Sequence, residues 1–201
     1  MSTTIREIVT PPHPVLRQQA RPVSDFGPEL QELVDDMVET MRTSQGVGLA
    51  ANQVAVPWQV IVVEMPATES DDPEELPPQP HAGELFTLVN PRISWQSRGT
   101  EESLEGCLSL PGIVGEVERH KEVRVDAQDR YGKSVRIRFK GWLARIFQHE
   151  IDHLHGVLFT DHIDDPDKIW PVTPGEEELI EAEAAGHQMR ARSETSDLTI
   201  S

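Results

Sequence analysis

The chain has 201 residues, a formal net charge of −17 at pH 7 and a single cysteine. This length suits one domain with its own core, with or without tails, and such acidity argues against wholesale nucleic-acid binding, so no DNA binding is expected. One cysteine excludes an internal disulfide. No apolar run approaches the roughly 18 residues that a membrane span needs, and the N-terminus shows no secretory signal. We therefore expect a cytoplasmic protein that does not bind membranes.

The first predicted element is a helix over residues 28–44, PELQELVDDMVETMRTS. Its apolar residues recur at the spacing of one buried helical stripe, and Pro28 suits the first helical position. The glycine-rich segment GVGLAANQ follows at residues 46–53. Its glycines argue against the start of another helix.

Two strands come next in the chain. VIVVEM at residues 60–65 has the composition of a buried strand, and ELFTLVNPRIS at 84–94 contains another. The second strand is predicted to end near Pro91, because proline cannot donate a hydrogen bond to a sheet. The segment between them, residues 66–83, contains acidic residues and prolines but no lysine or arginine, so we expect a mobile loop.

A hairpin and a second helix complete the predicted elements. VRVDAQD at 123–129 and SVRIRFK at 134–140 form the hairpin, with Gly132 in its turn. WLARIFQHEIDHLH at 142–155 forms a helix that Gly156 ends. This order of elements predicts an α+β fold, in which antiparallel or mixed β-sheets surround a central helix that bears the HEIDH motif.

The predicted domain covers residues 1–165 and contains the 66–83 segment as an insertion. Residues 166–201 are expected to form an acidic C-terminal tail, partly helical or disordered, because the chain is polar and acidic from Pro171 onward.

The motif HEIDH, residues 149–153, predicts a metal site on the second helix. At 100° per residue, Glu150 falls within the apolar arc of this helix, and His149 and His153 fall at its edge. Imidazoles four residues apart can reach one metal ion, while the glutamate between them can reach a water molecule there without being a ligand. The polar side of the helix carries Arg145, Gln148, Asp152 and His155.

The extended pattern HExxHxxGxxH fits at Gly156 but places Phe159, which cannot bind metal, at the third histidine position. The residues alone then leave two candidates for the third ligand. One is a glutamate of the tail, among residues 176–178. The other is Cys107 in EGCLSLPG, because a thiolate is a strong ligand for borderline metals. A Cys, His, His site leaves one position open, which is typical of catalytic metals.

GVGLAANQ, EGCLSLPG and QHEIDH together resemble the three motifs of bacterial peptide deformylases, in the order that the family has them. The resemblance covers about residues 5–165. It implies an enzyme with the peptide-deformylase fold that removes the N-formyl group from the initiator methionine of new proteins and releases formate. It also implies that Cys107, His149 and His153 hold one divalent ion, Fe²⁺ in the cell, with Zn²⁺, Ni²⁺ or Co²⁺ as substitutes.

By the same resemblance, Glu150 takes a proton from the attacking water and passes it to the leaving amine. The side-chain amide of Gln53 and the backbone N–H of Leu108 donate hydrogen bonds to the oxyanion of the tetrahedral intermediate. Glu105, paired with Arg119, is a candidate for orienting a ligand.

The resemblance also assigns a binding site for formyl-methionyl peptides. An extended substrate lies along the glycine segment, where Gly46 and Gly48 permit close approach. The predicted pocket for the methionine side chain is lined by Val47, Ile146 and His149. It extends to Trp142 and Arg145, two positions where relatives often carry aliphatic residues.

Nascent peptides near the ribosome are the expected partners, and no oligomer is predicted. Some relatives dock on the ribosome through a basic C-terminal helix, so the acidic tail is not expected to dock. Two other functions stay open on the residues alone. One is a zinc endopeptidase of the HExxH type with a glutamate as third ligand, and the other is a non-catalytic metal-binding relative.

Overall fold

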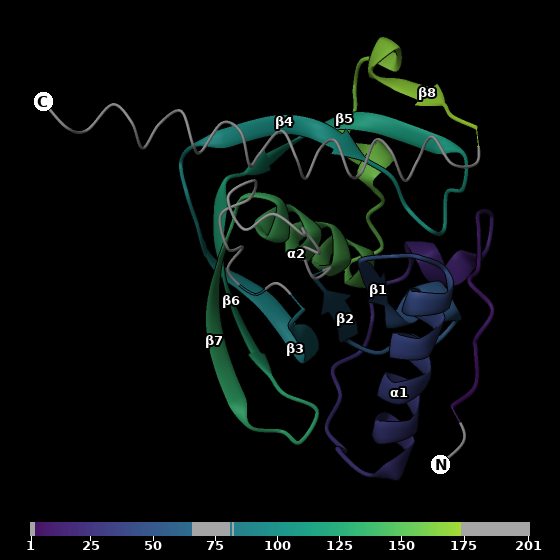
Figure 1. Ribbon diagram of the computed structural model, residues 1–201, viewed down its shortest axis with the longest axis vertical. Helices are drawn as coiled ribbons and strands as arrows, with labels where there is room; N and C mark the ends of the chain where they lie inside the picture. The colour runs from purple at the N-terminus through teal and green to yellow at the C-terminus, as the bar shows by residue number, and fades with distance from the viewer. Residues whose placement is uncertain (1–2, 66–80, 82, 174–201) are drawn as a thin grey trace, which may run out of the picture.

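The computed structural model describes residues 3–65, 81 and 83–173 (Figure 1). Most of the acidic insertion and all of the tail beyond residue 173 lie outside these residues. Within the described part, no helix is long and apolar enough to cross a membrane.

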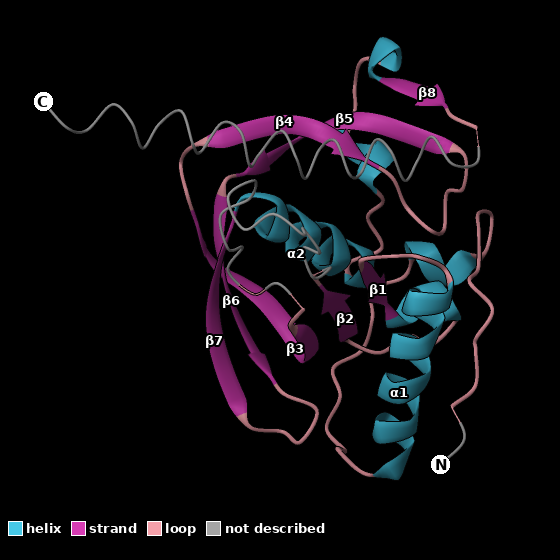
Figure 2. Cartoon of the chain, viewed as in Figure 1, coloured by secondary structure: helices cyan, strands magenta, loops and turns pink. Residues whose placement is uncertain are grey.

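The described part of the chain contains two antiparallel sheets and two α-helices (Figure 2). The larger sheet has the strand order β1-β2-β3-β6-β7, and the smaller has the order β4-β5-β8. The larger sheet consists of β1 (Gly48–Ala50), β2 (Val60–Glu64), β3 (Leu85–Gln96), β6 (Glu122–Gln128) and β7 (Ser134–Lys140). The smaller sheet consists of β4 (Thr100–Glu105), β5 (Ile113–His120) and β8 (Ile169–Pro171).

The second helix, α2 (Gly141–Leu154), lies between the two sheets and contacts strands of both (Figure 1). The first helix, α1 (Pro28–Thr43), packs beside β1 and β2. Four 3₁₀ helices complete the described elements: η1 (Pro14–Arg17), η2 (Ala51–Val54), η3 (Phe159–His162) and η4 (Pro166–Lys168). The predicted α+β class, with the motif-bearing helix at its centre, is confirmed.

The hydrophobic core has two parts, one on each side of β1 and β2. Ile61 and Val63 of β2 face α2, where they join Phe147 and Ile151 in one cluster. Their neighbours in β2, Val60 and Val62, face the apolar stripe of α1 in the second cluster. Because β2 is covered on both faces, its sequence is apolar throughout rather than alternating.

The prediction that a strand ends near Pro91 was wrong. β3 runs through this residue to Gln96, with a shift of register between Val89 and Arg92. Asn90 adopts a left-handed backbone conformation with φ of 53°. The bulge accommodates the proline, which has no N–H to give to the ladder.

The polar side of α2 is largely covered by protein. Arg145 and Gln148 are each only 4% exposed, because the smaller sheet covers this side of the helix. The helix ends as predicted, with Gly156 at a φ of 75°.

The described fold continues beyond residue 165, where the sequence placed the start of the tail. β8 pairs with β5, Ile113 opposite Pro171 and Gly115 opposite Ile169. The division of the chain into a domain and a tail stays a prediction, and residues 174–201 lie outside the described part.

Candidate active site

Three potential metal ligands converge between α2 and the loop that joins β4 to β5. His149 and His153 lie one turn apart on α2, and Cys107 lies in the loop. The Cys107 Sγ is 3.2 Å from His153 Nε2, which is 3.2 Å from His149 Nε2. All three ligand atoms lie within 4.8 Å of one another. The structure thus brings together the three residues that the family resemblance assigned. Two of them, Cys107 and His153, lie 46 positions apart in the chain.

This donor set fits a single borderline metal ion. A thiolate and two imidazoles are ligands that suit Zn²⁺ and Fe²⁺, and three protein ligands leave one position open. Burial and the neighbouring His149 lower the pKa of His153 well below its usual value. Burial also lowers the pKa of His149, but hydrogen bonds with Cys107 and Glu105 outweigh it and raise that pKa.

Glu105, the last residue of β4, orients His149. Its Oε2 lies 2.9 Å from His149 Nδ1, so the carboxylate accepts the imidazole proton there and leaves Nε2 for the site. Burial by itself raises the pKa of Glu105, but hydrogen bonds from His149 and Arg119 outweigh it and hold the pKa well below its usual range. Glu105 is therefore ionised and a permanent acceptor.

Two buried arginines neutralise Glu105. Arg119 Nε and Arg145 Nη1 donate to its Oε1 at 2.9 and 2.8 Å. Arg119 also pairs with Asp152, which receives a further bond from His162 at the surface. The predicted pairing of Glu105 with Arg119 is present, and Asp152 also takes part in an ion pair.

Gln53, in η2, places its amide beside the candidate metal ligands. Its Oε1 accepts a hydrogen bond from the Ala50 backbone N–H at 2.8 Å. Its Nε2 donates to Ser109 Oγ at 3.2 Å and lies 3.5 Å from Cys107 Sγ. The sequence did not single out Ser109, although it lies in the EGCLSLPG motif two residues after Cys107.

Glu150 and Leu108 are held against the glycine segment. A Cβ atom added at Gly48 would lie 2.4 Å from Glu150 Oε1, and one added at Gly46 would lie 2.6 Å from Leu108 Cδ1. The two glycines therefore make room for side chains of the site, a different role from the predicted approach of a substrate.

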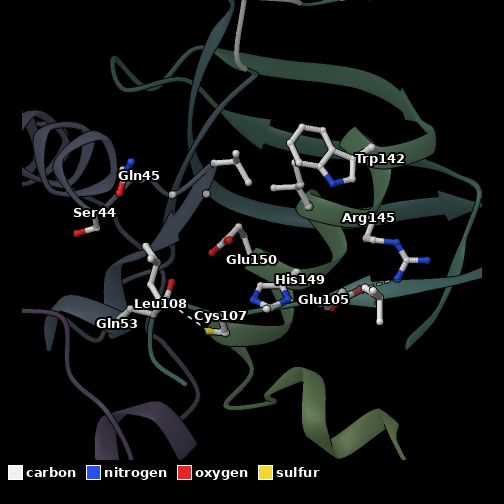
Figure 3. A pocket seen from close by; sticks show the side chains of 16 residues that line it. Ser44, Gln45, Gln53, Glu105, Cys107, Leu108, Trp142, Arg145, His149 and Glu150 are labelled. Atoms are coloured by element: carbon white, nitrogen blue, oxygen red, sulfur yellow. Dashed lines mark hydrogen bonds and ion pairs between the residues drawn. The ribbon is translucent and has the colours of Figure 1, made fainter. Parts of the chain in front are cut away.

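A cavity of about 270 Å³ opens beside these residues (Figure 3). Glu150, His149, Cys107, Gln53 and Leu108 line it at one end, and Figure 3 shows Trp142 at the other. All the residues predicted to bind the substrate line the cavity: Gly46, Val47, Gly48, Trp142, Arg145 and Ile146. Ser44 and Gln45 line it as well. The sequence did not assign them, although they directly precede the glycine segment.

Arg145 contributes to this cavity only as part of its wall. Its Nη1 donates to the Val117 carbonyl at 2.8 Å as well as to Glu105, and its Nη2 donates to the Glu101 carbonyl at 2.6 Å. Figure 3 shows the guanidinium directed toward Glu105. The guanidinium of Arg145 thus makes its ion pair and hydrogen bonds with the smaller sheet.

The other described histidines lie apart from this cluster. His13, His155 and His162 are exposed, whereas His81 and His120 are partly buried. His120 Nδ1 lies 2.8 Å from the Ser97 carbonyl oxygen. The remaining one, His187, lies outside the described residues.

Comparison with known proteins places the chain in a family. A family model described as polypeptide deformylase matches residues 5–169. The chain is 46% identical over 181 residues to a peptide deformylase of Symbiobacterium thermophilum, covering 90% of this chain and 76% of the relative. It is 43% identical to one of Thermomicrobium roseum, covering 89% of this chain and 97% of the relative.

Solved structures agree with these matches. A class I type b peptide deformylase from Acinetobacter baumannii, with Met-Ala-Ser bound, has a TM-score of 0.72 at 34% identity, over 81% of this chain and all of that chain. A peptide deformylase from Thermotoga maritima has a TM-score of 0.70 at 36% identity, over 81% of this chain and 99% of that chain. The chain therefore belongs to the peptide deformylase family of metal-dependent hydrolases, which remove the formyl group from N-terminal formyl-methionine.

Proposed function

We propose that Cys107, His149 and His153 hold one divalent metal ion and that Glu150 is the general base of deformylation in this chain. The observation that supports this most strongly is the convergence of the three ligand atoms within 4.8 Å at the end of the cavity that Glu150 lines. Fe²⁺ is the proposed ion in the cell, and Zn²⁺, Ni²⁺ and Co²⁺ are proposed substitutes because the donor set suits several metals.

The proposed mechanism assigns a task to each residue. The bound metal supplies a Lewis acid that lowers the pKa of a water molecule and polarises the formyl carbonyl. Glu150 accepts the proton of the attacking water and then gives it to the amine as the carbon–nitrogen bond breaks. Gln53 Nε2 and the Leu108 backbone N–H donate to the oxygen that becomes negative, and the products are formate and a free N-terminal amine.

The substrate is proposed to lie extended along β1, which is an edge strand of the larger sheet. In this arrangement the methionine side chain enters the cavity between Val47, Ile146 and Trp142. The Acinetobacter baumannii relative was solved with Met-Ala-Ser bound, which supports a peptide as the ligand. Since the substrates are nascent chains, we further propose that the enzyme works near the ribosome, in the cytoplasm.

Formate release from formyl-Met-Ala-Ser tests the proposal, with protein prepared anaerobically with Fe²⁺ or loaded with Ni²⁺. We expect rapid release by the native chain. Glu150→Gln should lower kcat by about 10²–10⁴-fold at unchanged metal content, because the amide cannot accept the proton.

The matched control is Glu102→Gln, which removes an exposed carboxylate of β4 and should keep full activity. A native chain that holds one metal ion but releases no formate would identify a non-catalytic relative. Full activity of Glu150→Gln would exclude Glu150 as the base.

A further inference from the structure

The outer face of β3, β6 and β7 carries a concentration of positive charge on an acidic protein. We call it the basic face, and it consists of Arg92, Arg124, Arg136, Arg138 and Lys140, with Asp126 and Glu122 among them. Five cationic groups against two carboxylates leave a surplus of three positive charges, whereas the whole chain carries −17. Deformylation does not use this face, because α2 and the cavity lie on the opposite side of the sheet.

The strand register places these side chains together. Arg124 lies opposite Arg138, Asp126 opposite Arg136, and Glu122 opposite Lys140, so the members of each pair project to the same side of the sheet. The alternate residues of β6 and β7, including Val123, Val125 and Phe139, are buried against α2. The arrangement is therefore a single charged surface rather than scattered residues.

The arginines extend over the carboxylates and are the outermost groups. Arg92 and Arg136 both bind Asp126, yet these arginine side chains are 70% and 67% exposed while Asp126 is 13% exposed. Arg138 binds Glu122 and is 56% exposed. A ligand approaching this face would meet guanidinium groups that the acids beneath already hold in place.

Two further features of the basic face suit a ligand that carries both phosphates and aromatic bases. Trp95 of β3 is 41% exposed, and the Arg138 guanidinium lies over its ring, 5.0 Å from the centroid. Beside it is an open hollow of about 390 Å³. Its polar lining consists of Asn90, Arg92, Asp126, Gln128, Ser134 and Arg136. Phosphate oxygens accept hydrogen bonds from guanidinium, amide and hydroxyl groups.

We propose that the basic face binds RNA, with phosphates at Arg92, Arg136 and Arg138 and an unpaired base stacked on Trp95. Four of its five cationic groups are arginines, which suit phosphate and stack on bases. The Debye length is about 8 Å at physiological salt, so this local surplus outweighs the distant negative charge. Among the described residues of β3, β6 and β7, Trp95 is the one exposed large apolar side chain that could insert into a lipid surface, and a second copy would bring its own charge of −17. This inference is independent of the proposed residue roles in deformylation.

The test is binding of a fluorescein-labelled 20-nucleotide poly(U) RNA to the full-length, Ni²⁺-loaded protein, measured by anisotropy between 50 and 200 mM salt. We expect micromolar affinity that falls with salt, as for a few phosphate contacts. Arg92→Gln/Arg136→Gln/Arg138→Gln should weaken binding by about tenfold or more. Arg17→Gln/Arg42→Gln/Lys168→Gln removes three ion-paired cations elsewhere and should bind within about twofold of the native protein.

Two readouts separate this proposal from a loss of folding or of activity. All variants should release formate from formyl-Met-Ala-Ser at the native rate, because none of these residues lines the cavity. RNA should quench tryptophan fluorescence in the native protein, and Trp95→Phe should remove most of the quenching.

Three outcomes would overturn the proposal. One is absence of RNA binding at 50 mM salt. The charges would then be explained by a different role, which is to prevent other strands from pairing with the β7 edge. The second is binding to phosphatidylglycerol vesicles but not to RNA. The third is a dimer, detected by sedimentation, that the triple variant of the basic face dissociates.

Discussion

At the scale of single residues, Gly48 shows how the fold fixes the position of the proposed base. Glu150 lies on α2 and Gly48 on β1, and the carboxylate occupies the space that a side chain on β1 would fill. Glu150 is 4% exposed, so its carboxylate is held by packing rather than by solvent. The geometry of the proposed proton transfer therefore depends on a residue that has no functional group.

Gly48→Ala should consequently displace Glu150 and lower kcat for formyl-Met-Ala-Ser by about 10²-fold, because a shift of about 1 Å in a reacting group costs this much. Metal content should not change. Gly99→Ala is the control, since a Cβ atom there would meet only Lys121 Cδ at 3.8 Å. Native kcat in Gly48→Ala would show that the Glu150 carboxylate can move without loss of function.

The sequence predicted some of the site residues without a structure and left others open. The HEIDH spacing placed His149 and His153 together, because residues four apart on a helix lie on one face. Nothing in the spacing connects Cys107 to them, since it reaches the site through the β4–β5 loop. The family resemblance assigned it, and the convergence of the three ligand atoms agrees.

At the scale of elements, Arg145 joins α2 to the smaller sheet. It is 4% exposed and donates hydrogen bonds to Glu105 and to the backbone of β4 and β5. The same carboxylate orients His149, so this contact connects the packing of α2 with the metal site.

Arg145→Ala should lower the free energy of unfolding by roughly 3 kcal/mol, because it removes one partner of a buried, hydrogen-bonded ion pair. Urea denaturation at pH 7 measures this difference. Arg98→Ala, which removes an exposed arginine after β3, should change the same quantity by less than about 0.5 kcal/mol. Equal effects of the two substitutions would contradict the role of Arg145 as a link between the layers.

Sequence patterns predicted α1, α2, β2 and the β6–β7 hairpin, but they did not predict the smaller sheet. TEESLE of β4 is mostly polar and partly exposed, so its composition resembles that of a surface loop. β8 has three residues and is a strand only because it pairs with β5, which lies about 55 positions earlier. Pairing across such separations is a tertiary effect that local patterns do not contain.

The same limit explains the error at Pro91. Proline disfavours the interior of a strand, but the left-handed conformation of Asn90 creates a bulge that accepts it. Asn90 is held there by its side chain, which accepts from the Val23 N–H and donates to the Val23 carbonyl, both at 2.8 Å. The polar side of α2 is likewise covered by a sheet that the sequence did not predict.

At the scale of the whole molecule, the proposed metal site joins the smaller sheet to α2, in addition to the buried ion pair between Arg145 and Glu105. Cys107 comes from the loop of the smaller sheet, and the histidines come from the helix that fills the space between the sheets. Gln53 and Glu150 reach the same cavity from the side of the larger sheet and from α2. The site thus lies where all the layers of the fold meet.

X-ray absorption spectroscopy of the Zn²⁺-loaded protein tests the central claim, the Cys107, His149 and His153 site, most directly. We expect one sulfur ligand at about 2.3 Å and two imidazole nitrogens at about 2.0–2.1 Å. Cys107→Ser should remove the sulfur scattering, whereas Ser109→Ala, two residues further on, should retain it. A native spectrum with nitrogen and oxygen ligands alone would contradict the claim and would point instead to a carboxylate as the third ligand.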